Sequence, residues 1–260
     1  MSFLKTVCEK KKKELERLTK DMKFAGAPVN RPGGELSFFT LQQECKKRGF
    51  FVIAEIKRAS PSKGLINPGL KAGRRALLYQ SNGASAISVL TDEEWFCGSL
   101  NDLKEVALTV SIPVLMKDFI VDPVQLEMGA VNGASMVLLI CKILKNNLNH
   151  YLELCKKLDL LPLVETGNEE EFKHALESGC RLIGVNARNL DTLEVDHRRF
   201  YRLAQLVKKA GQKGVLVVAE SGFARREEVK EIIELGYHGV LIGTRLSKPD
   251  GVAFLNELTG

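Results

Sequence analysis

The chain has 260 residues, of which 45% are hydrophobic and 27% charged, and its formal net charge is +6. No apolar run approaches the ~18 to 20 residues of a membrane helix, and residues 1–18 lack the apolar stretch of a secretory signal. The six cysteines show no CxxC spacing, so we expect reduced thiols, no metal site of the zinc kind and a cytoplasmic location.

The excess of positive charge is compatible with nucleic acid or with an anionic small substrate as the partner. The basic runs at 10–13, 197–202 and 225–226 lie in helix-like segments among acidic neighbours. No aromatic–basic motif of the kind that binds single-stranded nucleic acid accompanies them. We therefore interpret these runs as solvated helix faces and expect neither nucleic acid nor a membrane as a partner.

The N-terminal part of the chain predicts two helices, over residues 3–20 and 35–48, joined by a loop at 24–34 that contains two prolines and three glycines. This segment precedes the first predicted strand and carries no obvious chemistry. We expect residues 1–48 to form a helical arm on a single domain that spans residues 1–260.

From residue 51 on, short apolar runs alternate with amphipathic segments. Eight strands that alternate with eight helices in a chain of this length predict an α/β fold. We expect a (β/α)8 TIM barrel with an N-terminal helical extension. A doubly wound open sheet is the alternative, but the glycine-rich GxGxxG loop that usually follows its first strand is absent. The predicted strands are 51–57, 85–90, 113–117, 135–140, 161–165, 182–186, 215–220 and 238–242, and the predicted helices lie near 70–82, 99–109, 122–132, 146–158, 168–178, 197–210, 225–236 and 250–259.

The stretch AEIKRASPSKG at residues 54–64 interrupts the apolar pattern at the end of the first predicted strand. Glu55 and Lys57 are two residues apart, so both face the same side of that strand. Burying this pair of charges costs roughly several kcal/mol unless they are paired or used. One interpretation is a structural salt bridge, and the other is a catalytic floor below a loop that binds phosphate or carboxylate.

Active sites of TIM barrels lie at the C-terminal ends of the strands. Three glutamates and two lysines fall on that rim here, and paired acids and bases in a closed pocket shift one another's pKa, which suits proton transfer near neutral pH. Each residue alone could simply end a strand, but together they indicate catalysis, and Lys57 or Lys117 could also form a Schiff base. The polar residues at the strand ends are Glu55, Lys57, Thr91, Asp92, Lys117, Glu165, Asn186, Arg188 and Glu220.

Small residues follow the seventh and eighth predicted strands, as Ser221-Gly222 and Gly243-Thr244. Loops at these two places commonly bind phosphate through backbone N–H groups in this fold, although glycines there could serve tight turns alone. Arg188 or Lys57 could add positive charge to the same anion. The four histidines, by contrast, are predicted away from the rim, which argues against a metal site and a histidine-based triad.

Seven motifs run through the chain: AEIKRASPSKG (54–64), SVLTDEEWFCGS (88–99), KDFIVDPVQL (117–126), LVET (163–166), IGVNARNL (183–190), VAESG (218–222) and LIGTRL (241–246). In order and spacing they resemble the indole-3-glycerol-phosphate synthase family. The resemblance implies a carbon–carbon lyase of tryptophan biosynthesis that needs no cofactor and no metal. Its reaction converts 1-(2-carboxyphenylamino)-1-deoxyribulose 5-phosphate to indole-3-glycerol phosphate by ring closure, decarboxylation and dehydration.

The resemblance also implies a role for each matching residue. Lys117 would be the general acid that protonates the substrate carbonyl oxygen during ring closure, and Glu165 the base or proton partner in dehydration. Glu55 would orient both lysines, and Lys57 would hold the anionic ends of the substrate. The remaining catalytic positions are Asn186, Glu220 and Ser221; the substrate-binding positions are Arg58, Ser60, Phe96, Phe119, Leu138 and Arg188; and the phosphate-binding positions are Lys57, Ser221, Gly222, Gly243 and Thr244.

By the same resemblance, the N-terminal arm would fold over the barrel mouth, and the protein would be a monomer or associate with other tryptophan-pathway enzymes. The chain departs from the family pattern at Met116, Thr166-Gly167, Asn189 and Thr244, none of which removes a proposed catalytic group. Two other functions stay open: another phosphate-binding barrel enzyme such as phosphoribosylanthranilate isomerase, and a barrel that binds phosphorylated ligands without catalysis.

Overall fold

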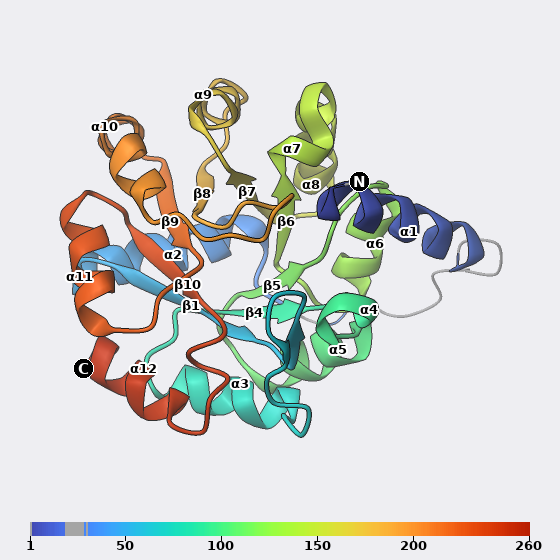
Figure 1. Cartoon of the computed structure of the whole chain (residues 1–260), viewed down its shortest axis with the longest axis horizontal. Helices are drawn as coiled ribbons and strands as arrows, with labels where there is room; N and C mark the ends of the chain where they lie inside the picture. The colour runs from blue at the N-terminus through green and yellow to red at the C-terminus, as the bar shows by residue number, and fades with distance from the viewer. Residues whose placement is uncertain (1, 19–28, 30) are drawn as a thin grey trace.

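The computed structural model describes residues 2–18, 29 and 31–260. Eight parallel strands close into a barrel in the order β1-β10-β9-β8-β7-β6-β5-β4, with β4 paired back on β1 (Figure 1). This arrangement confirms the predicted TIM barrel. The barrel strands are β1 (Phe51–Ile56), β4 (Ala86–Leu90), β5 (Val114–Lys117), β6 (Met136–Ile140), β7 (Leu161–Thr166), β8 (Leu182–Asn186), β9 (Leu216–Glu220) and β10 (Gly239–Ile242).

Helices surround the barrel, one or more after each strand (Figure 1). The larger ones are α3 (Ala72–Ser81), α5 (Leu100–Thr109), α6 (Val124–Val131), α8 (Leu148–Lys157), α9 (Glu169–Glu177), α10 (Arg198–Gln212), α11 (Arg226–Glu234) and α12 (Gly251–Thr259). Five short elements were not predicted, because each is too brief to show a periodicity. They are the hairpin β2 (Ala59–Ser60) with β3 (Gly64–Leu65), the helices α4 (Glu93–Phe96) and α7 (Cys141–Leu144), and the 3-10 turn η1 (Lys145–Asn147).

Alternate residues of each strand enter two different cores. On β1, Val52, Ala54 and Ile56 pack outward against the helices, while Phe51 and Ile53 fill the barrel interior. Glu55 continues the inward-facing series, one layer above Ile53. The same alternation on the other strands brings polar side chains to the top of the apolar interior, which is where the sequence predicted the site.

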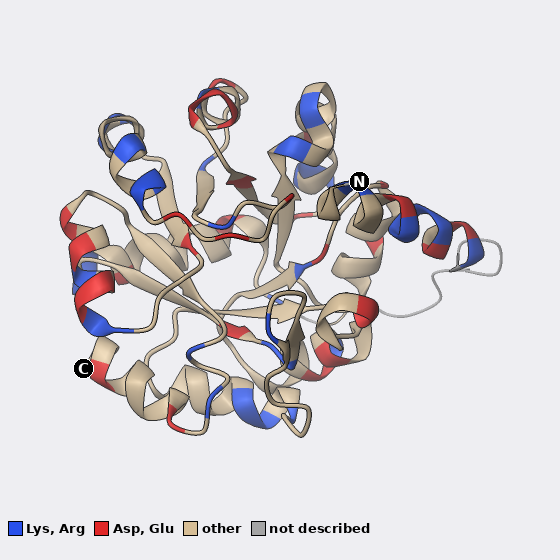
Figure 2. Cartoon of the chain, viewed as in Figure 1, with Lys and Arg blue, Asp and Glu red and all other residues tan. Residues whose placement is uncertain are grey.

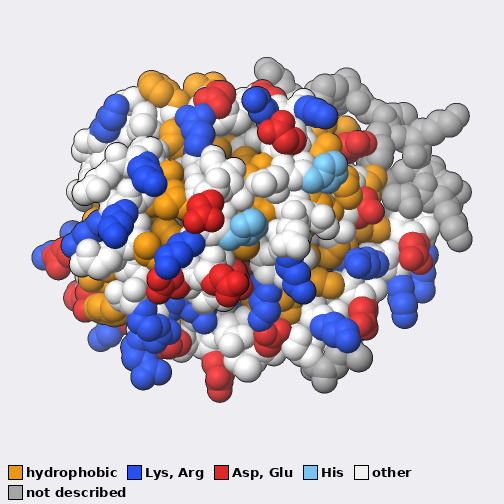
Figure 3. All heavy atoms as spheres, turned by 90° about the horizontal axis from the view of Figure 1, so that it is seen from above, with side chains coloured by type: hydrophobic (Ala, Val, Ile, Leu, Met, Phe, Trp, Pro, Cys, Tyr) orange, Lys and Arg blue, Asp and Glu red, His pale blue; other side chains and the backbone are white. Residues whose placement is uncertain are grey.

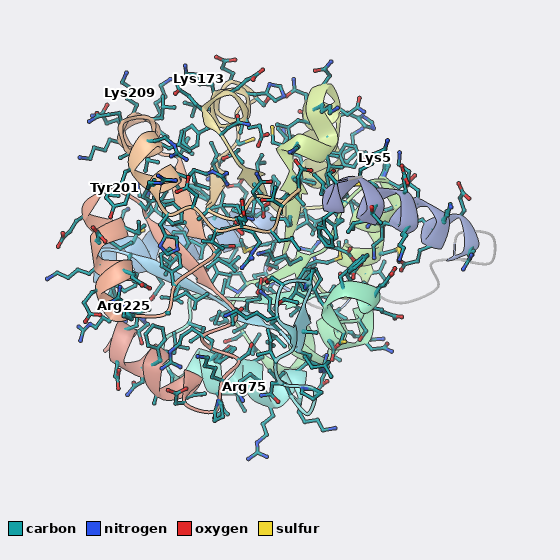
Figure 4. The ribbon with its side chains drawn as sticks, viewed as in Figure 1. Lys5, Arg75, Lys173, Tyr201, Lys209 and Arg225 are labelled. Atoms are coloured by element: carbon teal, nitrogen blue, oxygen red, sulfur yellow. The ribbon has the colours of Figure 1, made fainter. Side chains whose placement is uncertain are left out.

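The charged residues of the chain lie both on the outer helices and at the centre of the barrel, where the strands end (Figure 2). On the outer helices they point away from the barrel, as Lys173, Lys209 and Arg225 do (Figure 4). The face seen in Figure 3 mixes positive and negative side chains. The interpretation of the basic runs as solvated helix faces holds for Lys12, Lys13 and Arg225 but is wrong for Lys11, which is only 4% exposed. None of the helices in the described part of the chain is long and apolar enough to cross a membrane.

The N-terminal arm divides between the two ends of the barrel, and this corrects the expectation that all of residues 1–48 cover the mouth. Helix α1 (Phe3–Leu18) lies at the mouth, where Lys11 contacts Asp92 and Asp118 just beyond the ends of β4 and β5. Helix α2 (Gly34–Arg48) lies under the opposite end.

The contacts of α2 identify that opposite end. The backbone N–H of Gly34 donates to Asp159 and the thiol of Cys45 donates to the carbonyl of His238, and both partners precede strands. Phe38 and Leu41 of α2 join the interior core from below, while Leu4 and Val7 of α1 join it from above. Of the predicted helix 3–20 and loop 24–34, residues 19–20, 24–28 and 30 lie outside the described residues.

Candidate active site

A buried cluster of charges occupies the centre of the rim. Glu55 is 1% exposed, and its two carboxylate oxygens pair with two lysines: Oε1 with Lys57 Nζ, and Oε2 with Lys117 Nζ at 3.1 Å. Lys117 Nζ also lies 3.2 Å from Oε2 of Glu220, which is fully buried. Four of the predicted catalytic residues, from β1 with its following loop, β5 and β9, are therefore in direct contact.

Two glycines make room for the carboxylates of this cluster. A Cβ on Gly184 of β8 would lie 2.1 Å from Glu220 Oε1, and a Cβ on Gly243 would lie 2.1 Å from Glu55 Oε1. Any larger residue at either position would push a carboxylate out of place. Gly243 was predicted only as a phosphate ligand and Gly184 was missed, since its sole signal in the sequence is a glycine inside an apolar strand.

The surroundings shift the pKa values of Glu55, Lys117 and Lys57 in different directions. Burial raises the pKa of Glu55, but Lys117 and Lys57 outweigh it and hold that pKa at about 2. Burial lowers the pKa of Lys117, yet Glu55, Glu220 and Glu165 more than compensate, so its pKa lies above the ordinary value. For Lys57, the effect of burial exceeds the opposing effect of Glu55, so the pKa of Lys57 is lowered. Lys117 thus keeps its proton more firmly than its neighbour does.

Glu165 at the end of β7 has the opposite perturbation to Glu55. Burial and the nearby charge of Glu220 raise its pKa to about 7, against the lowering effects of Lys117 and Asn186. Burial also raises the pKa of Glu220. A carboxyl group that titrates near neutral pH can both accept and return a proton under physiological conditions.

Two cavities meet above this cluster. The first, the polar cavity, has about 680 Å³ of space and contains the phosphate-binding residues that the sequence predicted. Lys63, from the loop after β1 that was expected to bind phosphate or carboxylate, also lines it, although no role was given to this residue. Lys248 lines it as well and was missed, because it lies on a loop whose folding over the rim has no sequence signal. The lining of the polar cavity includes Lys57, Lys63, Arg188, Ser221, Gly222, Gly243, Thr244 and Lys248.

The second, the apolar cavity, has about 540 Å³ of space and lies beside the polar cavity. Its walls include the three predicted apolar residues, Phe96, Phe119 and Leu138, and the rings of Phe96 and Phe119 lie 6.2 Å apart. Glu165 and Asn186 line it as well. The two cavities share Glu55, Lys57, Lys117, Arg188 and Ser221, so they form one continuous site with an apolar end and a cationic end.

Comparison with known proteins assigns the chain to a family. The sequence model of the family described as indole-3-glycerol phosphate synthase matches residues 4–258. The chain belongs to the indole-3-glycerol phosphate synthase family. Curated relatives with that name include one from Ruminiclostridium cellulolyticum, 40% identical over 99% of both chains, one from Aquifex aeolicus, 41% identical over 86% of both, and one from Desulforamulus reducens, 42% identical over 78% of this chain and 76% of its own.

The departures from the family pattern lie beside the charge cluster rather than in it. Met116 points outward and contacts Gly129. Thr166 donates its hydroxyl to the carbonyl of Gly184, and Asn189 Oδ1 accepts from the backbone of the following loop. Thr244 alone lines the site, in the polar cavity. The charged groups on which the resemblance to indole-3-glycerol phosphate synthases rests are therefore unaltered.

The structure does not bring Arg58 and Ser60 to the two cavities. The guanidinium of Arg58 makes two hydrogen bonds of 2.7 Å to the carboxylate of Asp102 and a third to the carbonyl of Cys97. Ser60 is buried in β2. Arg58 thus ties the loop after β1 to α5 instead of facing the substrate cavities.

His197 lies nearer the site than predicted, so the expectation that all four histidines avoid the rim is wrong for this residue. Its Nε2 would be 2.0 Å from a Cβ on Gly222, and its ring stacks on Phe223 with centroids 6.1 Å apart. The imidazole therefore supports the loop after β9 from behind. Within the described ranges, no group of three or more His, Cys, Asp or Glu side chains is placed to hold a metal ion.

Proposed function

We propose that this chain catalyses the reaction for which its family is named. It is a carboxy-lyase of tryptophan biosynthesis, which converts 1-(2-carboxyphenylamino)-1-deoxyribulose 5-phosphate to indole-3-glycerol phosphate. The observation that carries the proposal is the meeting of the apolar and polar cavities at the pair of Glu55 and Lys117. A substrate with an aromatic ring at one end and a phosphate at the other spans both cavities with its reacting carbons over the charges.

The charge states give each group a role. Lys117, whose pKa is raised by three carboxylates, stays protonated and protonates the substrate carbonyl oxygen as the ring closes. Glu165, with a pKa of about 7, removes a proton during dehydration. Glu55 orients Lys57 and Lys117 through one oxygen each. Because acid and base come from different strands, each can address a different atom of one bound substrate.

Binding follows the same division. The phosphate lies against the backbone N–H groups of Gly222 and Gly243 and the hydroxyl of Thr244, with Lys57 and Arg188 neutralising its charge. The anthranilate ring lies in the apolar cavity, whose walls exclude water and so strengthen the contacts of the charged groups. We propose that the enzyme works in the cytoplasm as one barrel domain over residues 1–260.

The test is a fluorescence assay for indole-3-glycerol phosphate formed from the carboxyphenylamino-deoxyribulose phosphate, with a chelator present. Turnover by the wild-type chain, and its loss in Lys117→Ala, is the expected result. No turnover although the substrate binds would refute the proposal and favour a barrel that binds phosphorylated ligands without catalysis. Isomerisation of phosphoribosylanthranilate instead would favour the other enzyme class.

A further inference from the structure

Lys11 of α1 is buried to a degree that is rare for a lysine, with 4% of its side chain exposed. Its Nζ lies 2.8 Å from Asp92 Oδ2, 3.3 Å from Asp118 Oδ1 and 3.0 Å from Glu14 Oε2. Asp92 follows β4, and Asp118 is the residue after Lys117 on the rim. One ammonium group of the N-terminal arm therefore joins two strand ends of the active site.

The two aspartates hold the walls of the apolar cavity. Asp92 Oδ1 accepts from the backbone N–H of Trp95 and so begins α4, the helix that carries Phe96. Asp118 Oδ1 accepts from the backbone N–H of Phe119, and its Oδ2 accepts from the hydroxyl of Thr91. Both aromatic walls of the cavity are thus fixed by a carboxylate that pairs with Lys11.

Asp92 and Asp118 are 4% and 11% exposed and both lie within 3.3 Å of Lys11 Nζ, so both depend on this cation. Burial raises the pKa of Asp118 above its ordinary value, and the charge of Lys11 and the hydroxyl of Thr91 offset only part of this rise. Removing one partner from a buried ion pair typically destabilises a protein by about 3–5 kcal/mol, whereas exposed pairs contribute little. The ion pairs between Lys11 and the two aspartates are therefore strong enough to hold the walls of the apolar cavity in place.

Helix α1 also contacts the apolar cavity directly. The ring of Phe3 packs edge-on against Trp95, with centroids 5.0 Å apart, and against Phe119, at 6.4 Å. The backbone N–H of Phe3 donates to Asp191 in the loop after β8. The helix therefore bridges the loops after β4, β5 and β8 across one side of the mouth.

We propose that Lys11 is a positioning residue for the reaction. Through Asp92 and Asp118 it holds Phe96, Phe119 and the main chain next to Lys117 in their working places, and it keeps α1 against the apolar cavity. This inference rests on the proposed function for its kinetic part, while the docking of α1 is independent of the reaction.

The test compares Lys11→Met with Lys11→Arg, and uses Lys13→Met on the exposed side of the same helix as the matched control. Trp95 is the sole tryptophan of the chain and touches Phe3, so its emission reports the docking of α1 without any ligand. For Lys11→Met we expect red-shifted emission, stronger acrylamide quenching and a kcat/KM about tenfold to a hundredfold lower. Lys11→Arg should recover most of both signals, and Lys13→Met should match the wild type.

If Lys11→Met does not fold, the double variant with Asp118→Asn leaves one carboxylate without its cation instead of two, and should recover folding. The proposal then requires that Trp95 emission stays red-shifted and kcat/KM stays low. Removing the charge of Asp118 does not restore the ion pairs that Lys11 makes between α1 and the rim. Wild-type emission and kcat/KM in Lys11→Met, or in the folded double variant, would overturn it. If the wild-type chain shows no turnover, the proposed function fails, and Trp95 emission alone decides whether Lys11 docks α1.

Discussion

Glu165→Gln is the substitution that tests the acid–base assignment most directly. The pKa of Glu165 is about 7 instead of its ordinary 4.5, because burial and Glu220 both disfavour its charge. If the ionised form is the base, kcat/KM should rise with pH through a limb near pH 7, with roughly a tenth of the maximum at pH 6 and roughly nine tenths at pH 8. The glutamine variant should lose about a hundredfold or more in kcat and also lose this limb.

The assay is the initial rate of indole-3-glycerol phosphate formation over a range of substrate concentrations between pH 5 and 9, which gives kcat and kcat/KM at each pH. Glu170→Gln, which changes an exposed acid on the neighbouring helix α9, is the matched control and should keep the wild-type profile. A limb near pH 7 that persists in Glu165→Gln would assign the titration to another group. A wild-type kcat/KM that does not vary between pH 6 and 8 would refute the role of Glu165 as a base.

The same pKa shift predicts an effect on stability. Because the pKa of Glu165 is higher in the folded than in the unfolded chain, the folded state holds this proton more tightly, and ionising the group destabilises the fold. The cost is absent below pH 4.5 and complete above pH 7, where a shift of this size amounts to roughly 3 kcal/mol. Glu165→Gln should therefore be more stable than the wild type towards urea at pH 8 and equally stable at pH 4.

Lys117→Ala should abolish most turnover while the substrate still binds, as measured by equilibrium titration; near-full activity would exclude Lys117 as the acid. Gly184→Ala should lower kcat at least about tenfold, because its Cβ would lie 2.1 Å from the carboxylate of β9, whereas Gly69→Ala, with open space around it, should be silent in the same assay. Gly222→Ala should raise KM, since its φ is +94° and its Cβ would meet His197. Adding His197→Ala should lower the KM only part of the way back to the wild-type value, because roughly 1–2 kcal/mol of backbone strain at position 222 remains. A return to the wild-type KM would show that the clash with His197 is the sole cause.

The sequence predicted the barrel well because two signals coincide in it. Apolar runs mark the strands, and a charged residue at the end of a run, such as Glu55 or Glu165, marks the end of the barrel where the site lies. These signals are local, so they survive without any knowledge of neighbouring strands. The structure confirmed every barrel strand to within one residue at each end.

The errors concern features that depend on distant parts of the chain. Amphipathicity shows that α2 has an apolar face but not which end of the barrel it covers. Gly184 matters only because the carboxylate of Glu220, on the neighbouring strand, lies where a side chain at position 184 would go. Arg58 lies within the motif that organises the site, yet its side chain finds Asp102, a partner 44 residues away. Position in a motif does not determine the direction of a side chain.

The division of the N-terminal arm between the two ends of the barrel has a consequence for the order of folding. Helix α1 docks on residues from the loops after β4, β5 and β8, and the thiol of Cys45 in α2 contacts His238, 193 residues further along the chain. Contacts between such distant residues form slowly, because the intervening chain must first be ordered. Helices α1 and α2, which are synthesised first, therefore dock last, after the strands that close the barrel have formed. Refolding should thus show a late phase in Trp95 emission that follows the recovery of most secondary structure.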